Sequence, residues 1–472
     1  MDTTQTIEKP ARPTVVEKRP ALPTGKELCL GGVPIGCQDN RRGLKYSLYD
    51  GIFSNAMLAL METFSVAAAV FLHSPPLAIS ILSSLPLFLS SIGQFLIPCV
   101  VDSSKGRKFY VLRGTVFQSI FLVLLGLSGW LSPDTRSWAF VIIFSLYGFS
   151  GNVISGLWMA WMGDMVPSGV RGRHFAWRNR FFSATQLVCA IGAGILSRKY
   201  TTDNAPWLFF ASVFFCASFF RLISSFMLSR QYEPPKCVSE DTKPIHVNLK
   251  TDRSLLFYGI SAALMQGAVA TSGPFFNVWY VRDLKFDYFT LSVASAATIL
   301  GTIISLPFWG KLADSVGNRR VILWTGVLVS TVPIPYIFSS YSWQIWALNF
   351  YTGLCWSGYN LSNFNYLLSA AGKDKPERKI SISVALTGLS VFFFSLLGGY
   401  LSTRLPHLFG WQLKSLFLFS SVLRFAVFGI LFIRFPVIEN EKTGALEIFH
   451  MVPGYRIGMG ILRNAYRAFR RI

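Results

Sequence analysis

Glu62 is an acidic residue inside an apolar stretch that is long enough to cross a membrane. Residues 57–61 before it read Met-Leu-Ala-Leu-Met, and residues 63–70 after it add only hydroxyl groups to apolar side chains. A carboxylate near the centre of such a span is costly unless it faces a cavity or a partner. We therefore expect Glu62 to face a polar path through the membrane. The alternative is a neutral or paired Glu62 that only holds helices together.

The composition is that of a membrane protein with an all-α fold. Of the 472 residues, 52% are hydrophobic and only 14% are charged, whereas a soluble domain carries about 25% charged residues. Long apolar runs separated by short polar loops predict twelve transmembrane helices. The predicted spans are 48–72, 76–101, 109–131, 138–163, 180–196, 207–228, 255–281, 288–312, 321–339, 343–370, 380–402 and 416–435.

The net charge of +21 reports membrane topology, and we expect no nucleic-acid partner. Most of the 44 Lys and Arg residues lie in the N-terminal arm, in the loops after even-numbered spans and in the C-terminal tail. Basic residues concentrate on the cytoplasmic side of membrane proteins. The distribution predicts an integral protein of the cytoplasmic (inner) membrane with both termini in the cytoplasm.

Five segments follow from these patterns. We expect a disordered cytoplasmic arm (1–47), a six-helix half (48–228), a cytoplasmic linker (229–252), a second six-helix half (253–435) and a basic tail (436–472). The tail is amphipathic, which predicts a helix lying on anionic lipids of the inner leaflet. A partner-binding helix or a disordered basic tail are the alternatives.

The sequence gives no sign of an enzyme. The seven Cys are scattered without metal-ligand spacing, the five His are dispersed, and no phosphate-binding GxxxxGK[ST] motif is present. We therefore expect no metal site, no cofactor and no catalytic residues.

The two halves look like copies of one another. Residues 48–52 (LYDGI) recur as 256–260 (LFYGI), and each half has a lone arginine in its sixth span, Arg221 and Arg424. Duplicated halves are typical of secondary transporters, whose substrate site lies between the repeats. The roles of the two arginines stay open: they could snorkel toward the inner interface, and a pair between Arg221 and Glu62 is not assured.

Five regions resemble a known family. Residues 308–320 (FWGKLADSVGNRR) resemble the signature loop of the major facilitator superfamily, and the first-half copy at 98–108 is a degraded version. Residues 61–64, 161–173 and 358–368 are similar to a poorly characterised bacterial branch of that superfamily. The resemblance covers residues 46–435 and implies two pseudo-symmetric six-helix halves that alternate access to the two sides of the membrane.

The same resemblance implies a gate at the signature loops. An acid at a helix end can bind a neighbouring helix in one conformation and release it in another; the alternative is a solvated loop whose basic residues only set topology. The candidate gating residues are Asp102, Arg107, Asp314, Arg319 and Arg320.

A substrate cavity lined by the first, fourth, seventh and tenth helices is also implied by the resemblance. Polar and small residues recur on one face of three of these helices, and polar side chains there can replace the hydration of a substrate. Ordinary helix packing is the alternative for each residue taken singly. The candidate cavity residues are Asn55, Thr63, Asn152, Trp158, Gln266, Trp356 and Asn360.

These observations predict a secondary active transporter that moves a small solute, with protons as the coupling ion and Glu62 as the proton-carrying residue. Two alternatives remain. The chain could be a uniporter in which Glu62 is structural, or a non-transporting receptor or lipid-handling protein on the same scaffold.

Overall fold

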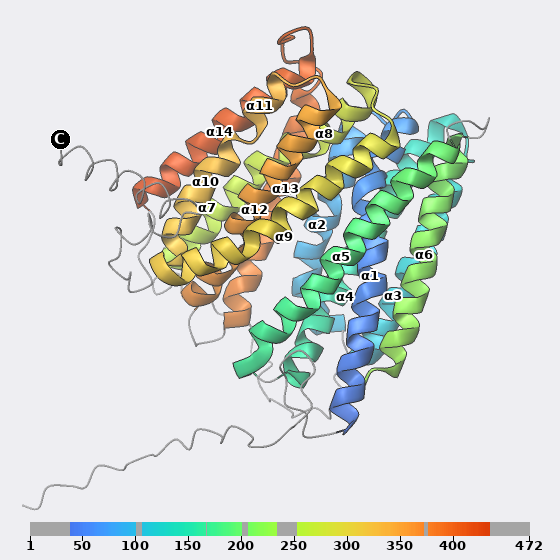
Figure 1. The fold of residues 1–472 in the computed structure, drawn as a ribbon, viewed down its shortest axis with the longest axis vertical. Helices are drawn as coiled ribbons and strands as arrows, with labels where there is room; N and C mark the ends of the chain where they lie inside the picture. The colour runs from blue at the N-terminus through green and yellow to red at the C-terminus, as the bar shows by residue number, and fades with distance from the viewer. Residues whose placement is uncertain are drawn as a thin grey trace, which may run out of the picture.

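The fold consists of two helical halves that lean against one another (Figure 1). The computed structural model describes residues 38–100, 106–166, 168–200, 206–233, 253–371 and 376–434. The first half contains α1 (Gln38–Phe71), α2 (Pro76–Val100), α3 (Arg107–Ser128), α4 (Pro133–Met165), α5 (Ser168–Tyr200) and α6 (Pro206–Arg230). The second contains α7 (Arg253–Ala270), α8 (Gly273–Val278), the π-helix η1 (Trp279–Asp283), α9 (Tyr288–Val316), α10 (Asn318–Thr331), α11 (Pro333–Ile337), α12 (Ser342–Ala371), α13 (Pro376–Leu401) and α14 (Gln412–Arg434).

The all-α fold class with two halves is confirmed. Ten helices of the described ranges are long and apolar enough to cross a membrane. The two predicted spans outside that set are the seventh, which is divided between α7, α8 and η1, and the tenth, α12, which carries several Asn and Ser residues. The outer surface exposes large apolar side chains on many helices, as expected where helices face lipid; examples are Val188, Ile195, Phe219, Ile304 and Val422.

Two helices that the sequence predicts as continuous are broken at proline. The predicted span 255–281 ends as α7 at Ala270 and resumes at Gly273, and the predicted span 321–339 is divided between α10 and α11. Proline has no N–H, and its ring meets the carbonyl of the residue four positions earlier. For Pro274 that residue is Ala270, and for Pro335 it is Thr331. A hydropathy profile does not detect these breaks, because the residues on both sides of each break are apolar.

Several helices extend beyond the apolar spans predicted for them. Helix α1 begins at Gln38, before the predicted start at Leu48, and α5 runs from Ser168 rather than from Arg180. A helix can continue past the hydrocarbon layer, where polar side chains no longer lower its stability. The consequence for α5 is that Arg178, expected in a loop, lies within the helix. The terminal arm up to residue 37, the tail and most of the linker lie outside the described residues.

The halves meet along two helix pairs, α2 with α13 and α5 with α9. At the first pair, Ser395 Oγ donates a hydrogen bond to the carbonyl of Ser80 (3.0 Å), and the Phe88 and Phe392 rings stack with centroids 4.5 Å apart. At the second, the Arg198 guanidinium lies 3.8 Å from the centroid of the Phe289 ring. The interface is built from small polar and aromatic side chains.

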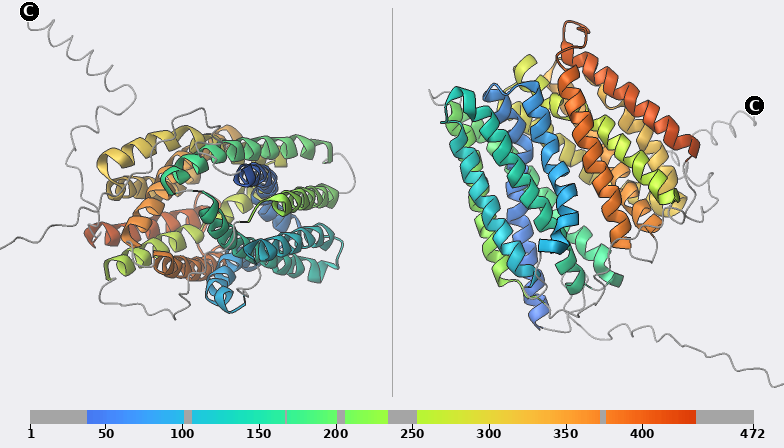
Figure 2. Two further views of the ribbon diagram at one scale, coloured as in Figure 1. Left: turned by 90° about the horizontal axis from the view of Figure 1, so that it is seen from below. Right: turned by 180° about the vertical axis from the view of Figure 1, so that it is seen from behind.

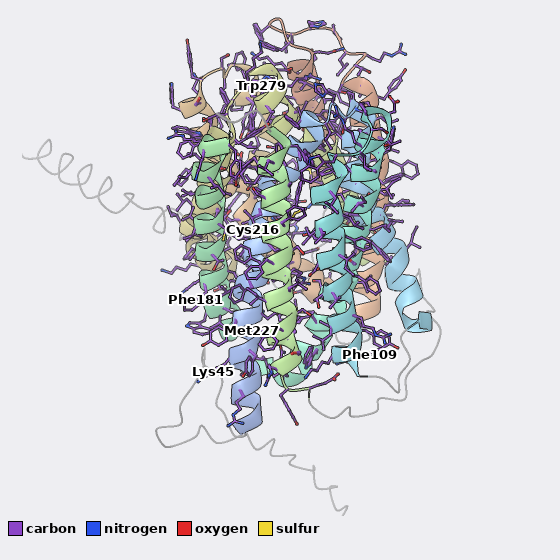
Figure 3. The ribbon with its side chains drawn as sticks, turned by 90° about the vertical axis from the view of Figure 1, so that its right-hand side faces the viewer. Lys45, Phe109, Phe181, Cys216, Met227 and Trp279 are labelled. Atoms are coloured by element: carbon purple, nitrogen blue, oxygen red, sulfur yellow. The ribbon has the colours of Figure 1, made fainter. Side chains whose placement is uncertain are left out.

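The two ends of the molecule differ in how closely the halves approach. At the end that contains α8 and η1, these elements also contact α1 of the other half. Toward the opposite end, where α1 begins, the ribbons of the two halves separate (Figures 1 and 2). Lys45 and Phe109 lie toward this open end, whereas Trp279 lies at the closed one (Figure 3).

Within the second half, α9 and α12 cross at glycine. The side chain of Thr298 donates to Asn349 Oδ1 (3.1 Å), and the Ser305 and Ser357 hydroxyls lie 2.5 Å apart. A Cβ placed on Gly301 would overlap the carbonyl of Phe350. Small residues let membrane helices approach this closely.

The substitution Gly301→Ala should therefore destabilise the protein, because two backbones must move apart. We expect a loss of about 1–3 kcal/mol, as for other overpacked sites, seen as a lower unfolding temperature in detergent. Gly429→Ala on α14 is the matched control, since no atom lies within 4 Å of an added Cβ there. Equal unfolding temperatures for the two variants would contradict the close crossing.

Candidate functional site

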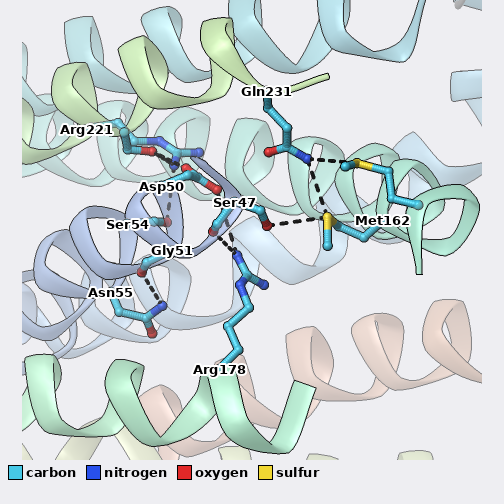
Figure 4. A network of polar contacts seen from close by, with 11 residues as sticks. Ser47, Asp50, Gly51, Ser54, Asn55, Met162, Arg178, Arg221 and Gln231 are labelled. Carbon is cyan, nitrogen blue, oxygen red and sulfur yellow. Dashed lines mark hydrogen bonds and ion pairs between the residues drawn. The ribbon is translucent and has the colours of Figure 1, made fainter. Parts of the chain in front are cut away.

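Three charged side chains meet inside the first half. Asp50 of α1, Arg178 of α5 and Arg221 of α6 are only 5%, 4% and 5% exposed, and they approach one another from three different helices (Figure 4). Groups of this kind persist in an apolar interior only when their hydrogen bonds are supplied by the protein. Their partners therefore define the site.

Arg221 is held by three neutral acceptors. Its Nε donates to Gln118 Oε1 (2.7 Å), and its Nη1 donates to the hydroxyls of Ser54 (3.2 Å) and Ser224 (3.0 Å). Ser224 in turn donates to Asp50 Oδ1 (2.6 Å). The carboxylate and the guanidinium are thus joined through a serine hydroxyl, which fixes the positions of both.

Arg178 makes fewer hydrogen bonds than Arg221 and packs between two aromatic rings. Its Nη2 donates to the carbonyl of Ser47 (2.7 Å) and lies 4.0 Å from Asp50 Oδ2. The Trp158 and Phe182 rings lie on it, each with a centroid 4.4 Å from the guanidinium carbon. A desolvated cation between two aromatic faces gains about 2 kcal/mol or more from each favourable contact.

The charged cluster forms one wall of a cavity of about 430 Å³. Three of the predicted cavity residues, Asn55, Asn152 and Trp158, line it as well. Gln186 donates to Asn55 Oδ1 (3.0 Å) and so orients this amide. The side chain of Asn152 is exposed and donates only to the carbonyl of Gly148, one helical turn earlier (2.9 Å). The cavity is therefore accessible from the Asn152 side.

Glu62 lies further along α1, outside the set of residues that line this cavity. Its side chain is exposed, although the residues from Thr63 to Ala69 and Met61 are buried. Helix α1 contacts helices of both halves. Within the described residues Glu62 makes no hydrogen bond or ion pair.

Among the described residues of the second half, none is an equivalent of the buried acid. Tyr258 takes the place that Asp50 has in the repeat, and its hydroxyl donates to Asn363 Oδ1. These two residues and the predicted Gln266 line a smaller cavity of about 150 Å³. Arg424 is buried and donates to the carbonyl of Val329 (3.0 Å) and to Ser272 Oγ (3.1 Å). Both lone arginines are thus turned inward, so the snorkelling interpretation is wrong.

The remaining predicted cavity residues are not gathered at either of these cavities. Thr63 is buried in α1, and Asn360 is exposed on α12. The Trp356 ring packs edge-on against Tyr359, with centroids 5.7 Å apart. Their placement leaves a binding role for these three residues as a prediction.

The predicted gating residues lie at helix ends. Asp314 is exposed in the last turn of α9, and Arg319 and Arg320 open α10 after Gly317, whose φ of 89° suits the sharp turn between them. Arg107 is the first residue of α3, and Asp102 lies outside the described residues.

A residue that the sequence did not single out caps α3. Glu233, just after α6, accepts from the backbone N–H of Lys108 (3.2 Å), and the Lys108 ammonium donates to the carbonyl of Gln231 (2.8 Å).

Sequence reasoning missed the centre of the site. Asp50 entered only as part of the repeated segment, and Arg178 was placed in a loop because the apolar run begins at Arg180. One signal was available: Trp177 and Phe182 flank Arg178 closely enough to suggest that the helix already starts before it.

Removing the carboxylate of Asp50 should lower the stability of the protein, because the two buried arginines then lose their negative counter-charge. Asp50→Asn leaves two cations in the apolar interior, and we expect a loss of about 3–5 kcal/mol measured by thermal unfolding in detergent. The double variant Asp50→Asn, Arg221→Gln should lose less than the sum of its single variants, because one uncompensated charge is removed. Asp134→Asn, at an exposed acid of α4, is the control and should change stability by less than about 0.5 kcal/mol. Additive losses would contradict the coupling.

Comparison with known proteins places this geometry in a family. The sequence model of the Major Facilitator Superfamily matches residues 47–276 and 256–453. The multidrug resistance protein MdtG of Proteus mirabilis (strain HI4320) is 26% identical over 258 residues, which make up 54% of this chain and 61% of that protein. MdtG of Enterobacter lignolyticus (strain SCF1) is 24% identical over 254 residues, or 53% and 58% of the two chains. The chain therefore spans about three-fifths of the length of these curated relatives.

Solved structures share the fold at low sequence identity. The nucleoside transporter NupG covers 84% of this chain and 99% of its own, with a TM-score of 0.60 and 10% identity. A bacterial homologue of the iron transporter ferroportin, in an inward-facing state, covers 83% and 98%, with a TM-score of 0.59 and 13% identity. The D-xylose-proton symporter covers 86% and 98%, with a TM-score of 0.59 and 14% identity. The family match across both helical halves shows that this chain belongs to the Major Facilitator Superfamily.

Proposed function

We propose that this secondary transporter moves a small solute by alternating access and that Glu62 couples the movement to protons. The observation that carries the proposal is the exposed, unpaired carboxyl group of Glu62 among buried neighbours (61 and 63–69) on a helix that touches both halves. Ionisable residues at such positions mark ion or substrate pathways.

The way the halves meet supports the alternating-access part. Their contact runs along α2–α13 and α5–α9, and α1 adds contact with α8 and η1 at one end. Two rigid halves joined by such helix pairs can rock until the open end closes and the closed end opens. Helix α1 lies near the centre of the bundle when it is seen end-on (Figure 2), and in this proposal Glu62 is accessible from the space between the halves during the movement.

Proton coupling requires that the protonation state of Glu62 depends on the surroundings of its carboxyl group. A carboxyl group in an apolar environment favours its neutral form, and contact with water favours the charged form. If only the neutral form allows the halves to rock, each cycle carries a proton in one direction. This differential interaction with two conformations is what a coupling ion needs.

A second candidate function comes from the relatives named multidrug resistance protein. In that case Glu62 would act as the counter-charge for a cationic solute that leaves the cell. A uniporter with a structural Glu62 is the third possibility. All three can be separated by one variant.

Glu62→Gln keeps the size and most hydrogen-bonding capacity of the side chain but cannot release a proton. In proteoliposomes we expect accumulation driven by a pH gradient to vanish, while exchange of labelled solute for unlabelled solute persists, because exchange requires no net proton movement. Asp134→Asn is the matched control and should retain both activities. Proton-driven accumulation by the Gln variant would exclude coupling through Glu62, and loss of both activities in a folded variant would favour direct binding of a cation.

The proposed orientation places both termini in the cytoplasm. In a variant without its native cysteines, single cysteines at Ser132 and His407, both exposed loop positions, should react with a membrane-impermeant maleimide added to intact cells. A cysteine at Lys45, also exposed, should react only after the membrane is permeabilised. Labelling of Lys45 in intact cells would reverse the orientation.

A further inference from the structure

We propose that the cavity beside Arg178 binds the carboxylate group of a small organic monoanion, and that this anion is the transported solute. The identification as solute rests on the proposed transport function; the binding site itself does not. The argument uses the charge of the cavity wall, the donors left unused on Arg178, and the shape and access of the cavity.

The wall of the cavity carries a net positive charge. The charged residues that line it are Asp50, Arg178 and Arg221, two cations and one anion. An uncompensated charge in an apolar interior is strongly unfavourable. A bound monoanion would make the wall neutral.

Arg178 has hydrogen-bonding capacity that the described protein residues leave unused. A guanidinium offers five N–H donors, and within the described ranges Arg178 makes one hydrogen bond, to Ser47, and one long ion contact, to Asp50. Its buried Nε has no acceptor. By contrast, Arg221 makes three hydrogen bonds to side chains. The free capacity is therefore concentrated on Arg178.

The surroundings orient Arg178 as a binding group. Trp158 and Phe182 cover the guanidinium faces, which leaves its edge for a ligand. The edge of a guanidinium matches the two oxygens of a planar carboxylate and binds them through parallel hydrogen bonds. A phosphate monoester carries nearly two negative charges at neutral pH and would leave the wall with a net negative charge, so a carboxylate fits better.

The cavity has room for the rest of such a molecule. Its volume is about 430 Å³, within the range of small-molecule sites, and exposed Asn152 and Ser155 on α4 line its accessible side. The corresponding cavity of the second half is lined by neutral residues, among them Tyr258, Gln266 and Asn363. Of these two cavities in the described part of the chain, the one in the first half has charged residues in its lining and the one in the second half does not.

Glu62 does not oppose this assignment. It lies outside the residues that line the cavity but interacts electrostatically with Tyr147, which does line it. The net positive charge of the wall therefore applies to the state in which Glu62 carries its proton. A cationic solute at this cavity would instead meet two arginines. Anion binding and proton coupling are compatible, since a monoanion and a proton together carry no net charge.

Binding can be tested on purified full-length protein without a gradient. The probes are benzoate, hexanoate and glucuronate, each compared with its neutral amide, with benzylamine as the cationic comparison and phenyl phosphate as the dianion. Thermal unfolding in detergent reports binding, since a ligand of the folded state raises the unfolding temperature with concentration. We expect at least one carboxylate to stabilise the protein at concentrations where its amide does not.

Three variants identify the site. Arg178→Gln should weaken carboxylate binding about tenfold or more, and Arg178→Lys should weaken it less, because it retains the charge but loses the two-pronged geometry. Asn152→Asp adds a negative charge at an exposed position, where folding is not at risk, and should also weaken binding several-fold. The control is Arg282→Gln, because Arg282 is an exposed arginine paired with Asp283 away from this cavity, and it should bind as the unmodified protein does.

Four outcomes would overturn the proposal. They are equal binding of acids and amides, no stabilisation by any of the three acids, preference for benzylamine, or unchanged affinity in both Arg178→Gln and Asn152→Asp. Stronger binding of phenyl phosphate than of any carboxylate would replace the monoanion by a dianion and equally refute the assignment. Because no gradient is involved, failure of proton coupling at Glu62 would leave these results unaffected.

Discussion

The need to hold two arginines inside an apolar protein shapes the first half of this molecule. Burial of a guanidinium is less costly when its donors find acceptors and a counter-charge lies nearby. The groups that surround the two arginines come from four different helices: Ser47, Asp50 and Ser54 on α1, Gln118 on α3, the Trp158 ring on α4, and Ser224 on α6. The charged cluster therefore fixes how the helices of this half are placed around a common centre. The cavity is the space that this arrangement leaves beside α1.

The second half buries its lone arginine, Arg424, without an acidic partner among the described residues. Arg424 donates to a backbone carbonyl and a serine hydroxyl, and the serine belongs to the turn between α7 and α8. Dense packing of apolar and aromatic side chains, such as the stacked Phe276 and Phe417 rings 4.3 Å apart, takes the place of a polar centre. The two lone arginines thus lie in different interiors, Arg221 near a buried acid and Arg424 among neutral acceptors.

Much of the fold was predictable because lipid permits few alternatives. A chain that crosses hydrocarbon must satisfy its backbone internally, so apolar spans translate directly into helices. The predicted spans differ from the described helices at the two breaks near proline and at the polar extensions of α1 and α5. The site was harder to predict. Asp50 and Arg178 lie at the ends of apolar runs, where a charged residue is normally taken to mark the end of a transmembrane span. The packing of α1 against α5 and α6 is what shows that the two residues are buried together. Asn55, Asn152 and Trp158 were predictable because each lies within a helix that the family resemblance places at the cavity.

The interruption of the seventh span gives its two segments different packing partners. Helix α7 packs along α13 and α14, whereas α8 and η1 rest on α1 of the other half. Thr271 and Ser272 separate the two segments, so each segment packs against its own neighbours. The seventh span thus belongs to both halves at once: its first segment is part of the packing of the second half, and its later segment is part of the contact with the first half.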